Sequence, residues 1–209
     1  MVKNMKKDLL DTQDMTQQEI LDILDLADKI KKNPANYSEI LKSLTLLMIF
    51  AKPSLRTRVS FEVGMTQMGG HAIYYDVATS PLGKKETMED TAKTASRYVN
   101  IIMARLFFHE DMVGLARHSS VPVINALDDM YHPCQILADL MTIREKKGKL
   151  KGIKLAYLGD CNNNVTHSLL TGCSKVGMNI TVASPKGEEY EPKKEIMEFA
   201  RQNAKSSGS

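Results

Sequence analysis

The chain has 209 residues, of which 43% are hydrophobic and 25% are charged, an ordinary composition for a soluble globular protein. Its formal net charge of +3 and sequence pI near 8.6 are only mildly basic, and the lysines and arginines are interspersed with acidic residues. This distribution excludes the basic stripe of a nucleic-acid-binding protein. The length suits one large domain or two small ones.

The cysteines and the apolar segments bear on the cellular compartment of the protein. Three cysteines without paired spacing make a poor disulfide framework, which fits a reducing compartment. Residues 1–8 are polar and hold no apolar signal core. The longest apolar stretch, residues 44–51, is too short to span a bilayer. We therefore expect a cytoplasmic protein with no membrane segment.

The first part of the chain predicts a helix, a strand and a second helix. Thr16-Gln17-Gln18-Glu19 has the form of a capping box, and apolar residues follow it at helical spacing as far as Ile30. Residues 44–50 predict a buried strand that ends at Lys52-Pro53. Helical spacing returns after Ser54 and stops at Gly69-Gly70.

Strands and helices then alternate. The pattern predicts strands over 71–75, 99–104 and 121–125, and helices over 87–98, 111–118 and 133–146. Pro133 stands at the first position of the last helix, where proline is tolerated. Such alternation favours a parallel sheet with right-handed crossovers.

A domain boundary is expected at the basic segment between Gly148 and Gly152. It divides the chain into a first domain over 1–147 and a second over 148–209. The second is predicted to hold strands over 153–158 and 179–183 and helices over 164–176 and 193–204. So small a unit buries too little apolar surface for an independent core, and we expect this domain to be incomplete in the chain. The predicted fold class is α/β, with two parallel-sheet domains.

The segment from Ser54 to Arg58 is a candidate phosphate site. It lies between a buried strand and a helix, and the free N–H groups and positive dipole end of a helix start attract anions. Two guanidiniums and two hydroxyls in the same turn add charge-assisted donors. The alternative is a solvated, well-capped helix start with exposed arginines.

Two further polar elements follow predicted strands. Arg105 ends the strand over 99–104, at the edge where ligands collect in open parallel sheets, although a lone arginine there is more often solvated. His132 and Gln135 open the helix over 133–146, where an imidazole and an amide can polarise a carbonyl and hold an NH2 group. The alternative for His132 is a helix cap. Together the three elements suit a small anionic ligand with a reactive carbonyl.

Four segments resemble the aspartate/ornithine carbamoyltransferase family. Residues 52–63 (KPSLRTRVSFEV) are similar to the family's phosphate-binding motif, and residues 103–105 (MAR) and 132–140 (HPCQILADL) match two more in the expected order. Residues 159–165 (GDCNNNV), followed by 167–169 (HSL), resemble the start of the ornithine-binding domain. The resemblance covers nearly the whole chain. It implies carbamoyl transfer from carbamoyl phosphate to the δ-amine of ornithine, giving citrulline and phosphate in arginine metabolism.

The resemblance also implies roles for individual residues. Those that hold the phosphate are Ser54, Arg56, Thr57 and the backbone at Leu55. Those that stabilise the carbonyl oxygen as charge develops are Arg105, His132 and Thr57. Gln135 helps to hold the carbamoyl amide, and Asn163 and Asn164 meet the amino-acid end of ornithine. Arg58 is expected to support the loop. The family implies no metal or organic cofactor, and a homotrimer or a multiple of trimers.

Three departures from the family pattern affect the prediction. Leu55 stands where most members have threonine, which is tolerable if the backbone makes the contact. The loop over 79–85 resembles one that reaches a neighbouring subunit's site, but Pro81 offers no side-chain donor there. The family's later ornithine-binding motifs do not occur before Ser209. We therefore expect this chain, taken as given, to be truncated, to bind carbamoyl phosphate poorly or not at all, and not to turn over.

Other functions remain open at this stage. A non-catalytic binding or oligomerisation module would keep the phosphate loop without the second substrate site, and putrescine or acetylornithine could replace ornithine. Gly159-Asp160-Cys161 lacks the glycines of a dinucleotide motif. His132 and Cys134 could suggest a thiol nucleophile activated by an imidazole. This is disfavoured because residues two apart at a helix start do not face each other. The five histidines show no metal-ligand spacing.

Overall fold

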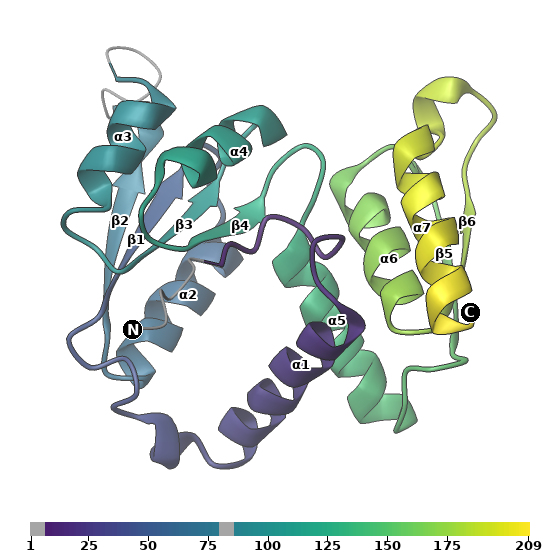
Figure 1. The fold of residues 1–209 in the computed structure, drawn as a ribbon, viewed down its shortest axis with the longest axis horizontal. Helices are drawn as coiled ribbons and strands as arrows, with labels where there is room; N and C mark the ends of the chain where they lie inside the picture. Colours follow the sequence, from purple (N-terminus) through teal and green to yellow (C-terminus); the bar gives the residue numbers. More distant parts are fainter. Residues whose placement is uncertain (1–6, 80–85) are drawn as a thin grey trace. The chain divides into compact units, whose positions relative to one another are not determined.

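The computed structural model describes residues 7–79 and 86–209 (Figure 1). These residues form two compact units. The first unit comprises residues 7–10 and Lys29–Asp128, and the second comprises Asp11–Asp28 and Asp129–Ser209. The chain therefore passes between the units more than once. The domain boundary expected between residues 147 and 148 stays a prediction, and residues 129–147 group with the second unit by compactness.

The first unit contains a four-stranded parallel sheet in the order β2-β1-β3-β4. Its strands are β1 Thr45–Phe50, β2 His71–Asp76, β3 Ile101–Arg105 and β4 Val123–Leu127. Its α-helices are α2 Leu55–Gln67, α3 Met88–Ala95 and α4 His109–His118, and its 3-10 turns are η1 Pro34–Tyr37 and η2 Val77–Thr79. The predicted strands, helices and parallel pairing of this region are confirmed.

Helices cover both faces of this sheet, so its strands are buried on each side. Ile49 and Ile102 pack with Leu115 in the core under α3 and α4. On the other face, Met48 and Met103 pack with Met65 of α2. Figure 1 shows α2 apart from α3 and α4, with the strands between. Near-continuous apolar strands such as β1 are what a doubly covered parallel sheet requires.

The ends of several elements differ from the prediction by up to three residues, among them β3, β4 and α4. α3 stops at Ala95, before the expected residue 98. The Ser96 hydroxyl bonds back to the Ala92 carbonyl at 2.6 Å, and Tyr98, which is 81% exposed, buries little apolar surface to extend the helix. The last helix continues to Ser207, beyond the expected residue 204. Gly208, with φ 78°, caps it in the left-handed region that favours glycine.

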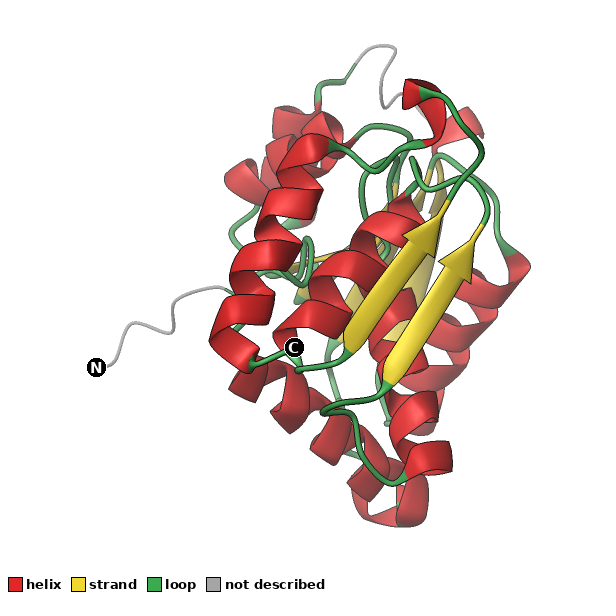
Figure 2. Ribbon diagram, turned by 90° about the vertical axis from the view of Figure 1, so that its right-hand side faces the viewer, coloured by secondary structure: helices red, strands yellow, loops and turns green. Residues whose placement is uncertain are grey.

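Among the described residues, the second unit has a smaller sheet and more helix than the first. Its elements are α1 Gln17–Lys32 as far as Asp28, α5 Pro133–Lys147, β5 Lys154–Leu158, α6 Asn164–Lys175, β6 Asn179–Ala183, η3 Glu188–Tyr190 and α7 Lys194–Ser207. Its two described strands pair in parallel (Figure 2). The capping box of α1 is confirmed, since Glu19 N donates to Thr16 Oγ1 at 3.2 Å and Thr16 N to Glu19 Oε2 at 2.8 Å.

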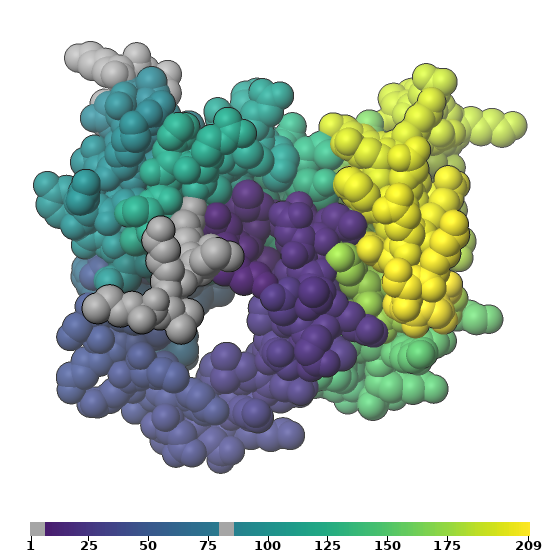
Figure 3. All heavy atoms as spheres, in the orientation of Figure 1, coloured from purple at the N-terminus to yellow at the C-terminus, as the bar shows by residue number. Residues whose placement is uncertain are grey.

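The helix α6 is the centre of the second unit. Every residue from Thr166 to Ser174 is buried. A Cβ at Gly172 would lie 2.4 Å from Ile136 Cγ1, so glycine permits the close approach of α5. On another side α7 packs against α6, and the outer surface of α7 is drawn in yellow in Figure 3. Across α5 and α1, Arg144 forms ion pairs with Asp25 at 2.7 Å and Asp28 at 2.6 Å.

A core substitution tests the packing of the first unit. Leu115 is fully buried, so Leu115→Ala should lower the free energy of unfolding by roughly 2–5 kcal/mol, from lost transfer energy and the cavity left behind. Tyr98→Ala, at an 81% exposed position in the same unit, should change it by less than about 0.5 kcal/mol. Urea unfolding of both variants measures the difference. Equal effects would contradict the described core.

Candidate active site

The first unit places a ligand site at the carboxyl ends of β1 and β3. The chain leaves β1 for β2 on one side, and β3 lies on the other side of β1. Ligands bind in open parallel sheets where the strand order reverses in this way. Phe50, which ends β1, pairs in register with Arg105, which ends β3, and Ala51 N donates to the Arg105 carbonyl at 2.9 Å. Residues after both strands therefore share one edge.

The helix α2 begins at this edge with donors directed outward from its first turn. Ser54 is the N-cap, with extended φ/ψ of −159° and 117°, and its Oγ accepts from Thr57 N at 3.3 Å. The N–H groups of Leu55 and Arg56 belong to the first turn, which has no intrahelical acceptors. The Leu55 side chain is 78% exposed and carries no donor. Any hydrogen bond from Leu55 to an anion must therefore come from its backbone N–H. The positive dipole end of α2 favours an anion at this point.

Two guanidiniums reinforce the positive potential. Burial and the nearby charge of Arg56 both lower the pKa of Arg105 below its ordinary value. The Arg105 Nε is buried and has no hydrogen-bond partner within the described residues. Over residues 7–79 and 86–209, neither Arg56 nor Arg105 forms an ion pair with a carboxylate. Like charges held near each other at a helix start are relieved by an anion of high charge.

Arg58 has a different environment. Its Nε lies 3.0 Å from Glu62 Oε2, one turn further along α2, and its guanidinium lies 4.0 Å from the centre of the Tyr74 ring. These contacts attach Arg58 to its own helix and to β2. The expected supporting role of Arg58 stays a prediction, and the geometry provides a matched control for Arg56.

The second unit carries His132 and Gln135 at the start of α5. His132 is the N-cap residue, but its side chain makes no capping hydrogen bond, so the simple capping alternative has no support in the geometry. Its backbone N–H donates to Ser168 Oγ at 2.8 Å. Gln135 is exposed, and its Nε2 donates to Asp139 Oδ1 at 2.9 Å. Burial raises the pKa of Asp139, with Gln135 opposing it.

Cys134, between these two residues, is poorly suited to nucleophilic chemistry. Burial raises the pKa of its thiol to about 12. A nucleophilic cysteine needs a lowered pKa. This environment disfavours Cys134 as a nucleophile.

Asn163 and Asn164 begin α6 in the same unit. Asn163 is the N-cap, and its Oδ1 accepts from Val165 N at 2.9 Å and Thr166 N at 3.1 Å. Its Nδ2 donates to the Tyr157 hydroxyl at 3.3 Å and to the Asp160 carbonyl. The Asn163 amide therefore holds its own loop together. Asn164 is the half-buried first residue of the helix.

Each unit thus groups part of the predicted set. Ser54, Leu55, Arg56, Thr57 and Arg105 come together at one sheet edge in the first unit. His132 and Gln135 on α5, and Asn163 and Asn164 on α6, belong to the second. Residues 80–85, which include Pro81 of the loop expected to reach another subunit, lie outside the described residues.

Comparison with known proteins identifies the family. The sequence profile described as aspartate/ornithine carbamoyltransferase, carbamoyl-P binding domain, matches residues 7–145, and the profile of the family's Asp/Orn binding domain matches residues 151–209. The chain belongs to the aspartate/ornithine carbamoyltransferase family. The α/β fold with parallel sheets is that of carbamoyltransferases.

Individual carbamoyltransferases show how close the likeness is. An ornithine carbamoyltransferase of Pyrococcus horikoshii is 51% identical over 211 residues, which cover 100% of this chain and 66% of that protein. One from Bacillus subtilis is 51% identical over 203 residues, covering 97% of this chain and 62% of its own length. The solved ornithine carbamoyltransferase of Pyrococcus furiosus superposes with a TM-score of 0.93 at 49% identity, over 97% of this chain and 64% of that one. The chain thus spans just under two thirds of the length of these relatives.

Sequence reasoning missed a buried polar network that follows β4 in the first unit. Asp128, fully buried, lies with its Oδ2 2.7 Å from His109 Nδ1 and accepts from Asn125 Nδ2 at 2.7 Å, and Asn125 also donates to the Leu10 carbonyl at 2.9 Å. Next to it in sequence, Leu127 pairs with Arg105 after a shift of register between Ala104 and Arg105. A buried carboxylate is costly unless it is hydrogen-bonded, but no local sequence pattern reveals its partners.

No helix in the described parts of this family member is both long enough and apolar enough to cross a membrane.

Proposed function

We propose that the protein, at the full length of its relatives, transfers the carbamoyl group of carbamoyl phosphate to the δ-amine of ornithine. The products are citrulline and phosphate. The observation that carries the proposal is the pair of Arg56, at the start of α2, and Arg105, at the end of β3, without a carboxylate partner in the described residues. The names of relatives about 50% identical support ornithine as the acceptor. The proposal includes a cytoplasmic homotrimer, as the family resemblance implies.

In the proposed mechanism the first unit binds the phosphate. The first-turn N–H groups of α2, the Ser54 and Thr57 hydroxyls and the Arg56 guanidinium hold its oxygens. These donors need no metal or organic cofactor to balance the phosphate charge. Because they are fixed by the helix and the strand ends, they are ordered before the ligand arrives and cost little reorganisation.

The carbamoyl carbon then reacts with the acceptor amine. The δ-nitrogen of ornithine forms a bond to the carbonyl carbon, and Arg105, His132 and Thr57 stabilise the negative charge that develops on the carbonyl oxygen. The carbon–oxygen bond to phosphate breaks as the tetrahedral intermediate collapses. Phosphate leaves with the electron pair, and the nitrogen loses a proton. Gln135 holds the carbamoyl NH2 group throughout.

Asn163 and Asn164 are proposed to meet the amino-acid end of ornithine. The bonds of Asn163 to its own loop favour a contact from the ordered turn rather than from a freely moving amide. Further ornithine contacts are assigned to the segment that the relatives carry beyond the length matched here. We therefore propose that the 209 residues alone do not support turnover.

Citrulline formation tests the proposed function. The assay compares the 209-residue chain with a protein lengthened beyond Ser209, either from its own gene or with the remaining segment of the Pyrococcus horikoshii relative. With carbamoyl phosphate and ornithine, only the longer protein should release phosphate and form citrulline in equal amounts. Putrescine and acetylornithine serve as competing acceptors. No citrulline from a folded longer protein would remove the ornithine assignment, and phosphate binding without turnover would favour a binding module.

Removing one guanidinium tests the assigned roles in the longer protein. Arg56→Ala or Arg105→Ala should lower kcat/KM by roughly two to three orders of magnitude, as for a lost preorganised donor. Arg58→Ala is the matched control, because Arg58 already contacts Glu62 and Tyr74, and its effect should stay within about tenfold. Steady-state kinetics measure all three. Near-wild-type activity after either of the first two changes would remove that residue from the site.

A further inference from the structure

The backbone that precedes the α5 helix is held by two adjacent residues of α6. Ser168, only 2% exposed, accepts a hydrogen bond from His132 N at 2.8 Å. His167, only 1% exposed, lies with Nδ1 3.1 Å from the Met130 carbonyl oxygen. All four residues belong to the second unit. Residues that are more than thirty positions apart in the sequence thus fix both ends of the Met130–His132 segment.

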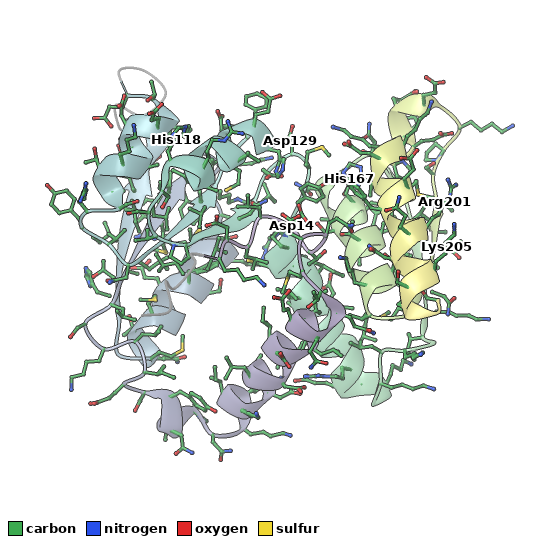
Figure 4. All side chains as sticks on the ribbon, in the orientation of Figure 1. Asp14, His118, Asp129, His167, Arg201 and Lys205 are labelled. Carbon is green, nitrogen blue, oxygen red and sulfur yellow. The ribbon has the colours of Figure 1, made fainter. Side chains whose placement is uncertain are left out.

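The contacts of His167 define its tautomer. A carbonyl oxygen only accepts, so Nδ1 carries the proton and donates to Met130. The other nitrogen, Nε2, faces the backbone N–H of Lys193 at 3.5 Å and is the acceptor. Both ring nitrogens are therefore used by the neutral, Nδ1-protonated form. Figure 4 labels His167 on α6, beside the start of α7.

The same helix also begins with Asn163, whose side chain caps it. Because every residue from Thr166 to Ser174 is buried, α6 is expected to move as a rigid element. A rigid helix with Asn163 at its start and His167-Ser168 one turn later fixes the backbone of His132 relative to the α6 N-terminus.

We propose that His167 and Ser168 are positioning residues that hold His132 in place for carbamoyl transfer, through the Met130 carbonyl and the His132 N–H. This inference rests on the proposed function, since it gives α6 a second task in the same reaction. Neither residue touches substrate. They act through His132, and they couple its position to the helix that presents the proposed ornithine contacts.

The hydrogen bonds of His167 also predict that the stability of the folded chain depends on pH. Burial, the largest cause, lowers the pKa of His167, and the charge of Lys193 lowers it further, while Met130, Glu195 and Asp160 oppose these effects. The stabilisation from neutral His167 is therefore complete above the ordinary histidine pKa. It declines as the pH falls through that value towards the lowered one. Protonation removes the Nε2 acceptor and places a second cation beside Lys193.

Ring and amide NMR of the 209-residue chain tests the link without any activity. In the ¹⁵N spectrum of the wild-type chain, His167 should be neutral with the proton on Nδ1 at pH 7. Ser168→Ala should speed hydrogen exchange of the His132 amide by about tenfold, as for one lost hydrogen bond. Ser174→Ala is the matched control, because Ser174 is similarly buried on α6 but bonds to the Leu170 and Thr171 carbonyls of its own helix and accepts from Asn203 Nδ2 of α7, not from the Met130–His132 segment.

Three results would overturn the proposal. They are a proton on Nε2 of His167 in the wild type, an unchanged His132 amide in folded Ser168→Ala, and an equal change in Ser174→Ala. The wild-type tautomer needs no variant, so misfolding cannot hide the answer. His167→Asn, whose amide can donate to the Met130 carbonyl, should keep the His132 amide protected and remove the part of the pH dependence of stability that His167 contributes, whereas His167→Leu should lose the protection.

Kinetics of the longer protein provide the functional arm. Ser168→Ala should lower kcat by about tenfold with little change in KM for carbamoyl phosphate, because a displaced His132 loses transition-state contacts. Ser174→Ala should keep both constants near wild type. Wild-type kcat in Ser168→Ala would overturn the positioning role. A wild-type longer protein that makes no citrulline would overturn the proposed function instead, and the tautomer and exchange results would still stand.

Discussion

Parallel pairing of β1 with β3 is the constraint on which the candidate site depends. The pairing puts Phe50, the last residue of β1, beside Arg105, and it puts the start of α2 at the same edge. The guanidiniums of Arg56 and Arg105 and the positive end of the helix dipole therefore converge. Within the described residues, no ion pair with a carboxylate offsets these charges. Repulsion between the two guanidiniums lowers the stability of the folded chain, and a bound anion of high charge would offset that repulsion. The proposed function identifies that anion as the phosphate group of carbamoyl phosphate.

The order and type of the helices and strands could be predicted from the sequence, because the hydrophobic period changes cleanly between them. Residues 44–50 are apolar throughout, as a strand covered on both faces must be, and the capping box at Thr16 marked the start of a helix. The ends were harder. α3 stops early, where a serine hydroxyl bonds to a backbone carbonyl and Tyr98 faces solvent. The short 3-10 turns at Pro34 and Glu188 carry no hydrophobic period and were not predicted.

Some residues of the candidate site could also be placed from the sequence, and others could not. Ser54–Arg58 and Arg105 could be placed at one edge because each follows a strand of the same parallel sheet. The supporting groups could not, since Ser168 reaches His132 from 36 positions away and Asp128 is held by His109 and Asn125 through tertiary contacts alone. Asn163 was assigned to ornithine only through the family resemblance, and its capping role was not predicted. An asparagine at a helix start serves equally as a cap and as a ligand, and its bonds here satisfy the cap.

A phosphate titration of the ¹⁵N-labelled 209-residue chain, followed by backbone amide shifts, tests the anion site most directly. Inorganic phosphate at millimolar concentration should move the amides of Leu55, Arg56 and Thr57 along saturating curves, even though binding is weak. The same titration of Arg56→Ala should leave them nearly still. Amides that do not respond in the wild-type chain, or that respond no more than those at the start of α7, would contradict the claim that this sheet edge is built to hold phosphate.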